Sequence, residues 1–337
     1  MSIEKKLFGK YGYDDVYSYT MTNKNGCSVT ILSYGGIINK IVVPDRNGKM
    51  GDIACGFDKV EDYVADSDSY TGAIVGRVGN RIAGNFMLDG KEIRIADNVL
   101  PGVHMHGGNV GFNRKMWYVD PTEGEGSDSL LLRYFSPDME EGYPGNLYVR
   151  VTYTFDDDNA LTIHYEADTD KKTYINLTNH VYFNLNGYDG CSAMEQELML
   201  NADYYDKLDE RLVPYKEPQT VDGTVFDFRK PKKIGIGFDN NFHLNGEGFR
   251  LCGTAYDEKS GRTLEMYTDL KGVQLYTAVE MAGPVNFKGN VPQKPLYAFC
   301  LETQNAPDLP NRPNLPQLFT EAGETYVTTT KFVFGTK

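Results

Sequence analysis

The sequence predicts an all-β protein, mostly antiparallel and with few short helices. Apolar and polar residues alternate with a period of two in several segments, which is typical of strands with one buried face. Helical periodicity is scarce. The 35 Gly and 15 Pro residues are spread through the chain and divide it into many short segments, as expected for strands joined by turns.

The clearest pattern predicts a hairpin over residues 147–167. Apolar residues alternate with polar ones through 147–155, the turn Asp156–Asn159 follows, and the alternation resumes through 161–167. The same rhythm predicts further strands at Ser129–Phe135, Thr263–Asp269, Val273–Val279 and Tyr326–Phe334.

Nothing in the sequence divides the chain. It has no linker, low-complexity run, charge block or repeat of 20 to 50 residues. A length of 337 residues suggests about two domains, but single β sandwiches reach this size. We therefore expect residues 1–337 to form one domain, a sandwich rather than a barrel, with a shallow cleft on a sheet surface.

The charge balance restricts the partners. The chain has 47 acidic and 34 basic residues, a net charge of −13, which argues against nucleic acid and anionic membranes because both carry phosphate. We expect a small neutral ligand. No run of about eighteen apolar residues predicts a membrane span, and the polar N-terminus lacks the apolar core of a signal peptide.

The cysteines favour a reducing compartment. There are five, an odd number, and they are far apart without any CxxC spacing. Free thiols in a cytoplasmic protein are therefore expected, rather than disulfides or a zinc knuckle. They are Cys27, Cys55, Cys191, Cys252 and Cys300.

Three separated segments carry proton-transfer side chains. They are HMHGG with His106, INLTNHVYFNLNG with His180, and LETQNAPDLPN with Glu302. Imidazole and carboxylate have ordinary pKa values on either side of about 5.5, so one of each can remove a proton from one atom and deliver a proton to another. The combination points to acid–base chemistry that needs no cofactor.

Each of these side chains also has a structural interpretation. His104 and His106 are two residues apart, a spacing that suits a metal, but no third ligand lies nearby in the sequence, so metal binding is the weaker interpretation. The glycines after His106 are equally consistent with a turn. Glu302 ends an apolar strand, where a carboxylate is either paired or held with a raised pKa.

The polar residues around His180 are costly to bury unless they are hydrogen-bonded. A sugar would supply many such bonds, and a network that only stabilises the sheet is the alternative. His164 and His243 are expected to be structural, and Trp117 is expected in the core rather than stacked on a ligand. Arg81 and Asp239 are single charges in Gly-rich contexts, for which a surface salt bridge is the structural interpretation.

Taken together, the segments resemble the aldose 1-epimerase (galactose mutarotase) family over nearly the whole chain. Each motif is weak alone, but their shared order and spacing make the match specific. The matching segments are GRVGNRI at Gly76–Ile82, HMHGG, GFNRKMW at Gly111–Trp117, NLTNHVYFNL, GTVFDFR at Gly223–Arg229, GFDNNF at Gly237–Phe242, VQLYT at Val273–Thr277 and LETQNAPDLPN.

The resemblance implies a galactose-mutarotase-like β supersandwich that interconverts the α and β anomers of free hexoses such as galactose and glucose. It implies that Glu302 is the general base at the C1 hydroxyl and His180 the general acid at the ring oxygen, with His106 supporting the acid. Substrate contacts are implied for Arg81, Asn80, Asp239 and Gln274. The chain departs from the family pattern at Asn240 and at Ala278–Gly283, so contacts at the rim are expected to differ.

No metal or other cofactor is implied, and the chain is expected to be a monomer or a homodimer. Three alternatives stay open. An epimerase for a phosphorylated hexose would need Arg or Lys near the cleft, for which Arg81 and Arg114 are candidates. A non-catalytic sugar-binding regulator would tolerate loss of the acid–base pair, yet Glu302, His180 and His106 are all present. A glycoside hydrolase would use two carboxylates, which fits one carboxylate with histidines poorly.

Overall fold

The central sheet of the molecule contains most of the strands that the period-two pattern predicts. In the computed structural model, which describes residues 2–190 and 192–337, nine strands form this sheet, and every pair in it is antiparallel. Their order is β11 (Tyr118–Glu123), β12 (Ser127–Ser136), β13 (Leu147–Asp156), β14 (Ala160–Thr169), β27 (Thr325–Thr336), β23 (Arg262–Thr268), β22 (Arg250–Tyr256), β17 (Glu197–Leu200) and β20 (Lys232–Lys233).

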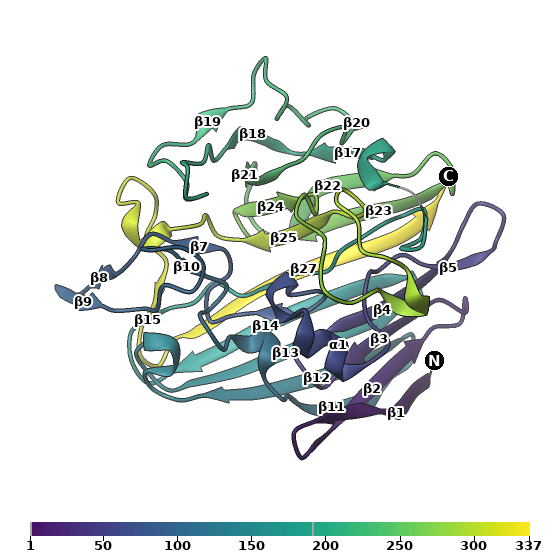
Figure 1. Cartoon of the computed structure of the whole chain (residues 1–337), viewed down its shortest axis with the longest axis horizontal. Helices are drawn as coiled ribbons and strands as arrows, with labels where there is room; N and C mark the ends of the chain where they lie inside the picture. The colour runs from purple at the N-terminus through teal and green to yellow at the C-terminus, as the bar shows by residue number, and fades with distance from the viewer. Residues whose placement is uncertain (1, 191) are drawn as a thin grey trace.

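The predicted hairpin is β13–β14. Leu147 pairs with Thr169 at one end and Phe155 with Leu161 at the other, and buried residues alternate with half-buried ones along both strands. The C-terminal strand β27 lies beside β14 in the middle of the sheet, so residues far apart in the sequence are neighbours there (Figure 1).

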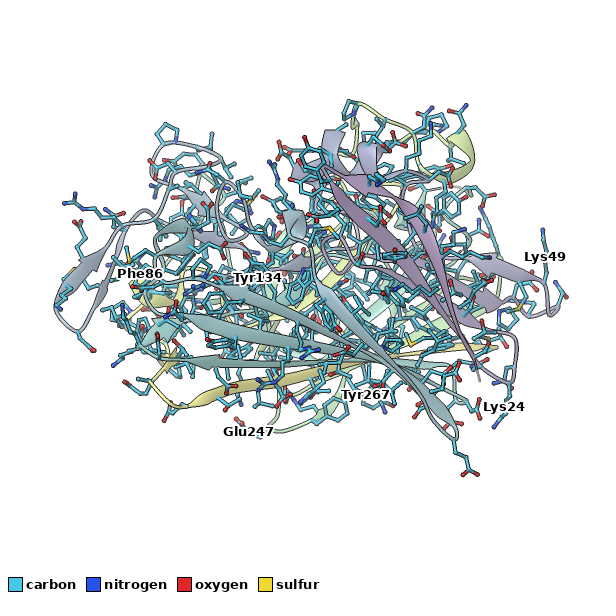
Figure 2. The ribbon with its side chains drawn as sticks, turned by 90° about the horizontal axis from the view of Figure 1, so that it is seen from below. Lys24, Lys49, Phe86, Tyr134, Glu247 and Tyr267 are labelled. Carbon is cyan, nitrogen blue, oxygen red and sulfur yellow. The ribbon has the colours of Figure 1, made fainter. Side chains whose placement is uncertain are left out.

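Two five-stranded sheets complete the main framework. The first follows the chain order: β1 (Ser2–Tyr11), β2 (Asp14–Thr22), β3 (Ser28–Leu32), β4 (Ile38–Pro44) and β5 (Met50–Asp52). The second has the order β19 (Gln219–Thr220), β18 (Ala202–Tyr205), β21 (Asp239–Leu244), β24 (Gly272–Tyr276) and β25 (Cys300–Gln304). In a second view, the purple N-terminal strands lie across one side of the long teal and yellow strands (Figure 2).

Short paired strands and single turns of helix make up the rest. The pairs are β6 (Ile74–Val75) with β16 (Thr178–Asn179), β7 (Arg81–Ile82) with β10 (His104–Met105), β8 (Phe86–Leu88) with β9 (Lys91–Ile93), and β15 (Thr173–Tyr174) with β26 (Phe319–Thr320). The helices are α1 (Val60–Ala65) and the 3₁₀ turns Ser67–Ser69, Phe112–Arg114, Glu140–Gly142, Ala193–Glu195, Lys288–Asn290 and Leu309–Asn311. The all-β, mostly antiparallel prediction is confirmed.

One predicted strand is too long. The pattern predicted Val273–Val279, but β24 ends at Tyr276. Ala278 has a φ of 52°, a left-handed conformation that cannot continue a ladder. The segment after Tyr276 therefore leaves the sheet.

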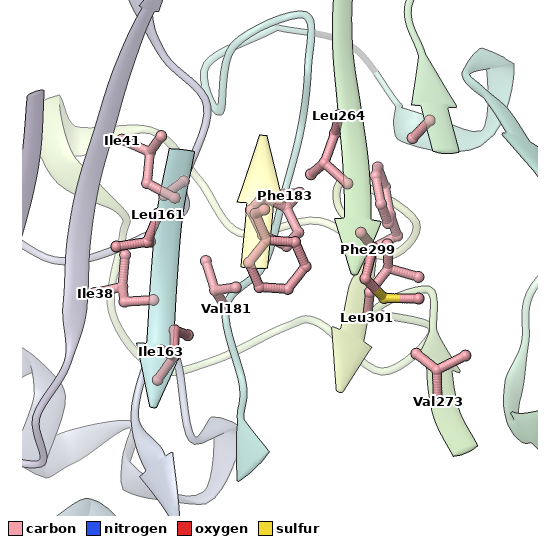
Figure 3. Close-up of a cluster of buried hydrophobic side chains, with 14 of the residues drawn as sticks. Ile38, Ile41, Leu161, Ile163, Val181, Phe183, Leu264, Val273, Phe299 and Leu301 are labelled. Atoms are coloured by element: carbon pink, nitrogen blue, oxygen red, sulfur yellow. The ribbon is translucent and has the colours of Figure 1, made fainter. Parts of the chain in front are cut away.

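A large core joins the three sheets. Ile38 and Ile41 from β4, Leu161 and Ile163 from β14, and Leu264 from β23 point into it, together with Val273 and Leu301 of the second five-stranded sheet (Figure 3). Val181 follows His180 in the sequence, and Leu301 precedes Glu302. The core therefore holds an immediate neighbour of each of these two site residues. Trp117 is 3% exposed and packs edge-to-face on Phe112, which confirms its place in the core.

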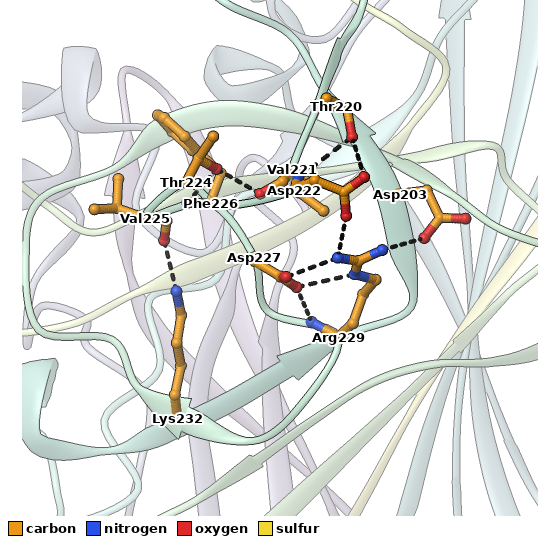
Figure 4. Close-up of polar contacts among 10 residues, drawn as sticks. All are labelled: Asp203, Thr220, Val221, Asp222, Thr224, Val225, Phe226, Asp227, Arg229 and Lys232. Carbon is orange, nitrogen blue, oxygen red and sulfur yellow. Dashed lines mark hydrogen bonds and ion pairs between the residues drawn. The ribbon is translucent and has the colours of Figure 1, made fainter.

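Ion pairs of Arg229 with three aspartates stabilise the GTVFDFR segment. Arg229 donates to Asp227 on its own turn, to Asp222 and to Asp203, and the Thr224 hydroxyl closes the preceding turn on the carbonyl of Val221 (Figure 4). These contacts stabilise the loop before β20 and lie outside the cleft described below.

Four of the five cysteines are buried free thiols, as expected: Cys27, Cys55, Cys252 and Cys300. Cys191 lies outside the described residues. Across the described chain, no helix has the length and apolar character that crossing a membrane requires.

Candidate active site

The structure brings all seven candidate site residues to one cavity of about 400 Å³. They come from three places: the second five-stranded sheet, the β7–β10 pair, and the residue that follows β16. The seven are Asn80, Arg81, His106, His180, Asp239, Gln274 and Glu302. Among the other residues considered from the sequence, His104, Arg114, Trp117, His164 and His243 do not line it.

Strand pairing aligns the carboxylate side of the site. Glu302 on β25 lies directly opposite Gln274 on β24, and Asp239 on β21 lies opposite Tyr276 on the other side of β24. Directly opposed residues project from the same face of a sheet. The polar face of this sheet therefore presents Glu302, Gln274 and Asp239 together, while Leu301 faces the core.

His180 is held at the end of a short strand. Its amide donates to the carbonyl of Ala73, and its carbonyl accepts from the amide of Gly72. Its Nε2 lies 3.5 Å from Glu302 Oε1, and its Nδ1 lies 3.5 Å from the thiol of Cys300. The imidazole is 4% exposed, so this pair meets with little water around it.

His106 is fixed by reciprocal contacts with Asn80. The His106 amide donates to the Asn80 carbonyl over 3.0 Å, and the Asn80 amide donates to His106 Nδ1 over 3.1 Å. Both residues have positive φ, 50° and 60°, which ends the β7–β10 ladder at the cleft. Because Nδ1 accepts a hydrogen bond, we assign the proton of the neutral ring to Nε2, where it can be donated.

Arg81, Asp239 and Gln274 form a clamp. Asp239 accepts from Arg81 Nη1 at 3.3 Å through Oδ2 and from Gln274 Nε2 at 2.6 Å through Oδ1. The Asn80 side-chain oxygen also accepts from the Arg81 amide at 2.8 Å. Charged and amide groups fixed in this way present donors and acceptors at set positions.

Burial shifts the acid–base groups away from their charged forms. It lowers the pKa of His180 to about 4, opposed by a contact with its own carbonyl. Burial, reinforced by Asp239 and opposed by Arg81, raises the pKa of Glu302 well above its usual range. Burial also lowers the pKa of His106, and His180 and Arg81 add to that effect. Burial therefore favours a single shared proton on the Glu302–His180 pair, since adding or removing a proton leaves a buried net charge.

Two buried oxygen atoms in the cavity have no hydrogen-bond partner among the described residues. They are Glu302 Oε2 and Gln274 Oε1. An unmade bond at a buried polar atom costs about 1–3 kcal/mol, so each such atom calls for an explanation. Hydroxyl groups of a ligand in the cavity would satisfy both.

Some observations on the histidines favour a metal site and others disfavour it. His106, His180 and Glu302 each have a potential ligand atom within 4.8 Å of the others. A metal bound at His106 Nε2 would require the ring proton to move to Nδ1. There it would point at the N–H of Asn80, which now donates to Nδ1. His104 binds the Ala96 carbonyl and the Tyr143 hydroxyl instead. The HMH spacing therefore brings only one histidine to the site.

Several cavity residues are missing from the sequence prediction. Tyr182 and Tyr276 lie two residues beyond His180 and Gln274, and their rings pack on the His180 ring with centroids 4.9 and 6.0 Å away. Residues two apart in an extended segment lie on the same side, so this spacing could have predicted both tyrosines from the sequence. Tyr70 packs on His106 at 4.5 Å, but nothing in its local sequence marks it. Asp66 and Gln293 also line the cavity.

The fold and the site define the class of protein. Solved structures of aldose epimerases share its arrangement of large antiparallel sheets. A solved structure of galactose 1-epimerase from Lactobacillus acidophilus matches with a TM-score of 0.85 at 28% identity, covering 99% of each chain. An aldose epimerase homologue from C. elegans matches with a TM-score of 0.86 at 28% identity, covering 94% of this chain and 98% of that one.

The chain belongs to the aldose 1-epimerase family, whose model matches residues 17–333. Galactose mutarotase of Homo sapiens is 41% identical over 316 residues, which cover 91% of this chain and 90% of that protein. Aldose 1-epimerase of Escherichia coli is 31% identical over 333 residues, covering 94% of each.

Proposed function

We propose that this protein is an aldose 1-epimerase that interconverts the α and β anomers of free hexoses such as galactose and glucose. The observation that carries the proposal is the buried pair of Glu302 and His180, 3.5 Å apart at a cavity with a hydrogen-bonding clamp. The relatives named galactose mutarotase and aldose 1-epimerase support the same activity.

In the proposed mechanism, Glu302 removes the proton from the C1 hydroxyl while His180 protonates the ring oxygen. The C1–O5 bond breaks as the C1 oxygen forms an aldehyde, and rotation about C1–C2 exposes the other face of the carbonyl. Closure reverses the roles of the two residues. A positioned acid or base contributes about 10²–10⁴-fold to such a reaction.

The pair needs one mobile proton for this cycle. With that proton on His180, Glu302 is a carboxylate ready to accept from the sugar, and after the transfer the proton is on Glu302. The two forms differ only in the position of one proton, so no net charge enters or leaves the buried site. His106, donating through Nε2, would support the ring oxygen as negative charge develops there.

The remaining site residues are proposed to hold the sugar. Asp239, Arg81 and Gln274 would bind hydroxyl groups, and Asn80 would fix both Arg81 and His106. The proposed chemistry lies entirely in protein side chains, and the small neutral ligand agrees with the acidic balance of the chain.

The charge of the cavity favours a free sugar over a phosphorylated one. Besides the Glu302–His180 pair, four carboxylate residues line it, against the single guanidinium of Arg81: Asp66, Asp68, Asp239 and Glu280. Arg114, the other candidate for a phosphate, pairs with Asp68 at 2.6 Å. Like charges 4 Å apart repel by about 1 kcal/mol in water and about 4 kcal/mol near a protein surface, which disfavours a phosphate.

The test is the optical rotation of freshly dissolved α-D-galactose and α-D-glucose with catalytic amounts of protein. We expect both rates to exceed the spontaneous rate, and equal concentrations of a hexose 6-phosphate to compete poorly. No acceleration by folded protein would refute the proposal. Tight binding of a free sugar without acceleration would instead favour the non-catalytic regulator, and acceleration confined to a sugar phosphate would favour the other epimerase.

A further inference from the structure

The cavity has a second carboxylate–amide pair that the proposed mechanism does not use. Asp66 lies between α1 and the 3₁₀ turn Ser67–Ser69, lines the cavity and is 8% exposed. Gln293, from the segment between β24 and β25, donates from Nε2 to Asp66 Oδ2 at 2.8 Å and to the carbonyl of Val285 at 2.8 Å. Both hydrogens of its amide group are therefore engaged.

This pair has the same chemistry as the clamp on the sheet. There, the Gln274 amide holds one oxygen of Asp239. In both places an amide fixes a carboxylate that lines the cavity, and a carboxylate fixed in this way accepts hydrogen bonds from hydroxyl groups with a set geometry. The elements differ, so the two pairs can bind different parts of one ligand.

Hydrogen bonds and ring packing connect the backbone of Asp66 to His180. The amide and hydroxyl of Ser69 donate to the Asp66 carbonyl, and the Tyr182 hydroxyl donates to the Ser69 carbonyl at 2.9 Å. The Tyr182 ring in turn packs on His180 at 4.9 Å between centroids. Asp66 is thus linked to His180 through Ser69 and Tyr182. It has no hydrogen bond or ion pair with Glu302 or His180, so we assign it no part in proton transfer.

Space at the pair is kept by a glycine. A Cβ atom on Gly283 would lie 2.4 Å from Gln293 Nε2 and 2.6 Å from Asp66 Oδ2. Any side chain there would push the pair apart or fill the space beside it. Gly283 belongs to Ala278–Gly283, the segment in which the sequence departs from the family pattern.

We propose that Asp66, held by Gln293, is a specificity-determining residue that accepts a hydrogen bond from a sugar hydroxyl remote from C1. The inference rests on the proposed function, which occupies C1 and the ring oxygen with Glu302 and His180. With Asp66 in this role, the substrates are neutral aldoses that have a hydroxyl at that position. Sugars with an anionic group there are disfavoured, because Asp66 is itself a carboxylate.

The test compares Asp66→Asn with wild type on galactose and on its 2-, 3-, 4- and 6-deoxy analogues. Loss of a hydrogen bond to a charged group predicts a fall in kcat/KM of about tenfold or more on galactose, mostly through KM. For the analogue that lacks the hydroxyl bound by Asp66, the kcat/KM of wild type should be lower than on galactose by a similar factor. On that analogue, Asp66→Asn should cause no further loss of kcat/KM. Glu61→Gln, at an exposed carboxylate on α1 outside the cavity, is the charge control and should match wild type.

Gln293→Leu provides a second variant that leaves Asp66 in place but releases it. It should reproduce the selective effect, with circular dichroism reporting that the fold is kept. An Asp66→Asn effect of equal size on every analogue, or no change in KM on galactose, would overturn the proposal.

Calorimetric titration with galactose separates this proposal from the proposed function. If wild type binds the sugar without converting it, the epimerase assignment fails, while weaker binding to Asp66→Asn than to Glu61→Gln still supports the role of Asp66. A wild-type protein that neither binds nor converts any of these sugars overturns both.

Discussion

At the scale of single residues, the site depends on side chains placed in environments that oppose their charge. Glu302 is 2% exposed and lies 3.5 Å from His180, whose pKa burial lowers to about 4. Such opposed shifts of neighbouring groups are common where proton transfer occurs. The same burial would be an unexplained cost for a merely structural carboxylate.

The pH dependence of kcat/KM follows from these shifts, because that ratio reports the ionisation of the free enzyme. Activity needs one proton on the pair, so it falls when the pair takes up a second proton and when it loses the first. Because the pKa of His180 is lowered and that of Glu302 is raised, we expect a broad plateau. It should end near pH 4 on the acid side and well above the usual glutamate range on the alkaline side, with both limits belonging to the pair. Activity that does not decline below about pH 4, or that does not decline at high pH, would contradict this prediction, as would a sharp optimum near pH 5.

The tautomer of His106 gives a second prediction. Since its Nδ1 accepts from the Asn80 amide, we propose that His106 donates a hydrogen bond through Nε2 rather than binding a metal. Prolonged incubation with EDTA should leave the mutarotation rate unchanged, with the protein's thermal midpoint measured in parallel. Activity lost to EDTA and restored by zinc would show that the three-ligand cluster of His106, His180 and Glu302 holds a metal.

At the scale of elements, tight turns determine where the side chains meet. Strand pairing sets Glu302 opposite Gln274, whereas His106 reaches the cleft only because the chain leaves β10 with positive φ and continues through two glycines. Gly107, at φ 85°, passes so close to the cis Gly76–Arg77 segment that a Cβ atom would lie 1.8 Å from the Gly76 carbonyl oxygen.

Gly107→Ala should therefore destabilise the protein strongly. The left-handed conformation costs an L-residue about 1–2 kcal/mol, and overpacking adds about 1–3 kcal/mol. Gly126→Ala is the matched control, because Gly126 has φ 79° but open space around its Cβ position. Chemical denaturation should show a clearly larger loss for Gly107→Ala, and equal losses would mean that the close approach contributes nothing.

The sequence predicts the elements unevenly, for physical reasons. The hairpin 147–167 and strand β27 were predictable because one face of each is buried and the alternation records it. The end of β24 was not, since Ala278 has no residue-type signal for a left-handed φ. Acid–base residues could be proposed from His106, His180 and Glu302, but Tyr70 and Asp66 reach the cavity through a turn whose path depends on tertiary contacts.

At the scale of the whole molecule, one core joins the three large sheets. Residues of β4, β14, β23, β24 and β25 belong to the same buried cluster (Figure 3). The site lies on the polar face of the second five-stranded sheet, so its precision depends on that sheet keeping its place against the others. We propose on this basis that the chain forms one cooperative domain.

A cooperative domain predicts coincident unfolding transitions. The fluorescence of Trp117, which is buried against Phe112, should change at the same denaturant concentration as the far-ultraviolet circular dichroism. Two transitions separated in denaturant would contradict the single-domain proposal and would place a boundary between the sheets.

The central claim, that Glu302 and His180 interconvert anomers together, is tested most directly by one measurement. The mutarotation rate of fresh α-D-galactose is followed by polarimetry with equal amounts of wild type, Glu302→Gln and His180→Asn, each shown to be folded. We predict acceleration by wild type and a fall of about 10²-fold or more in each variant, because each removes one proton-transfer group. If either folded variant retains the wild-type rate, the assigned acid–base pair is wrong.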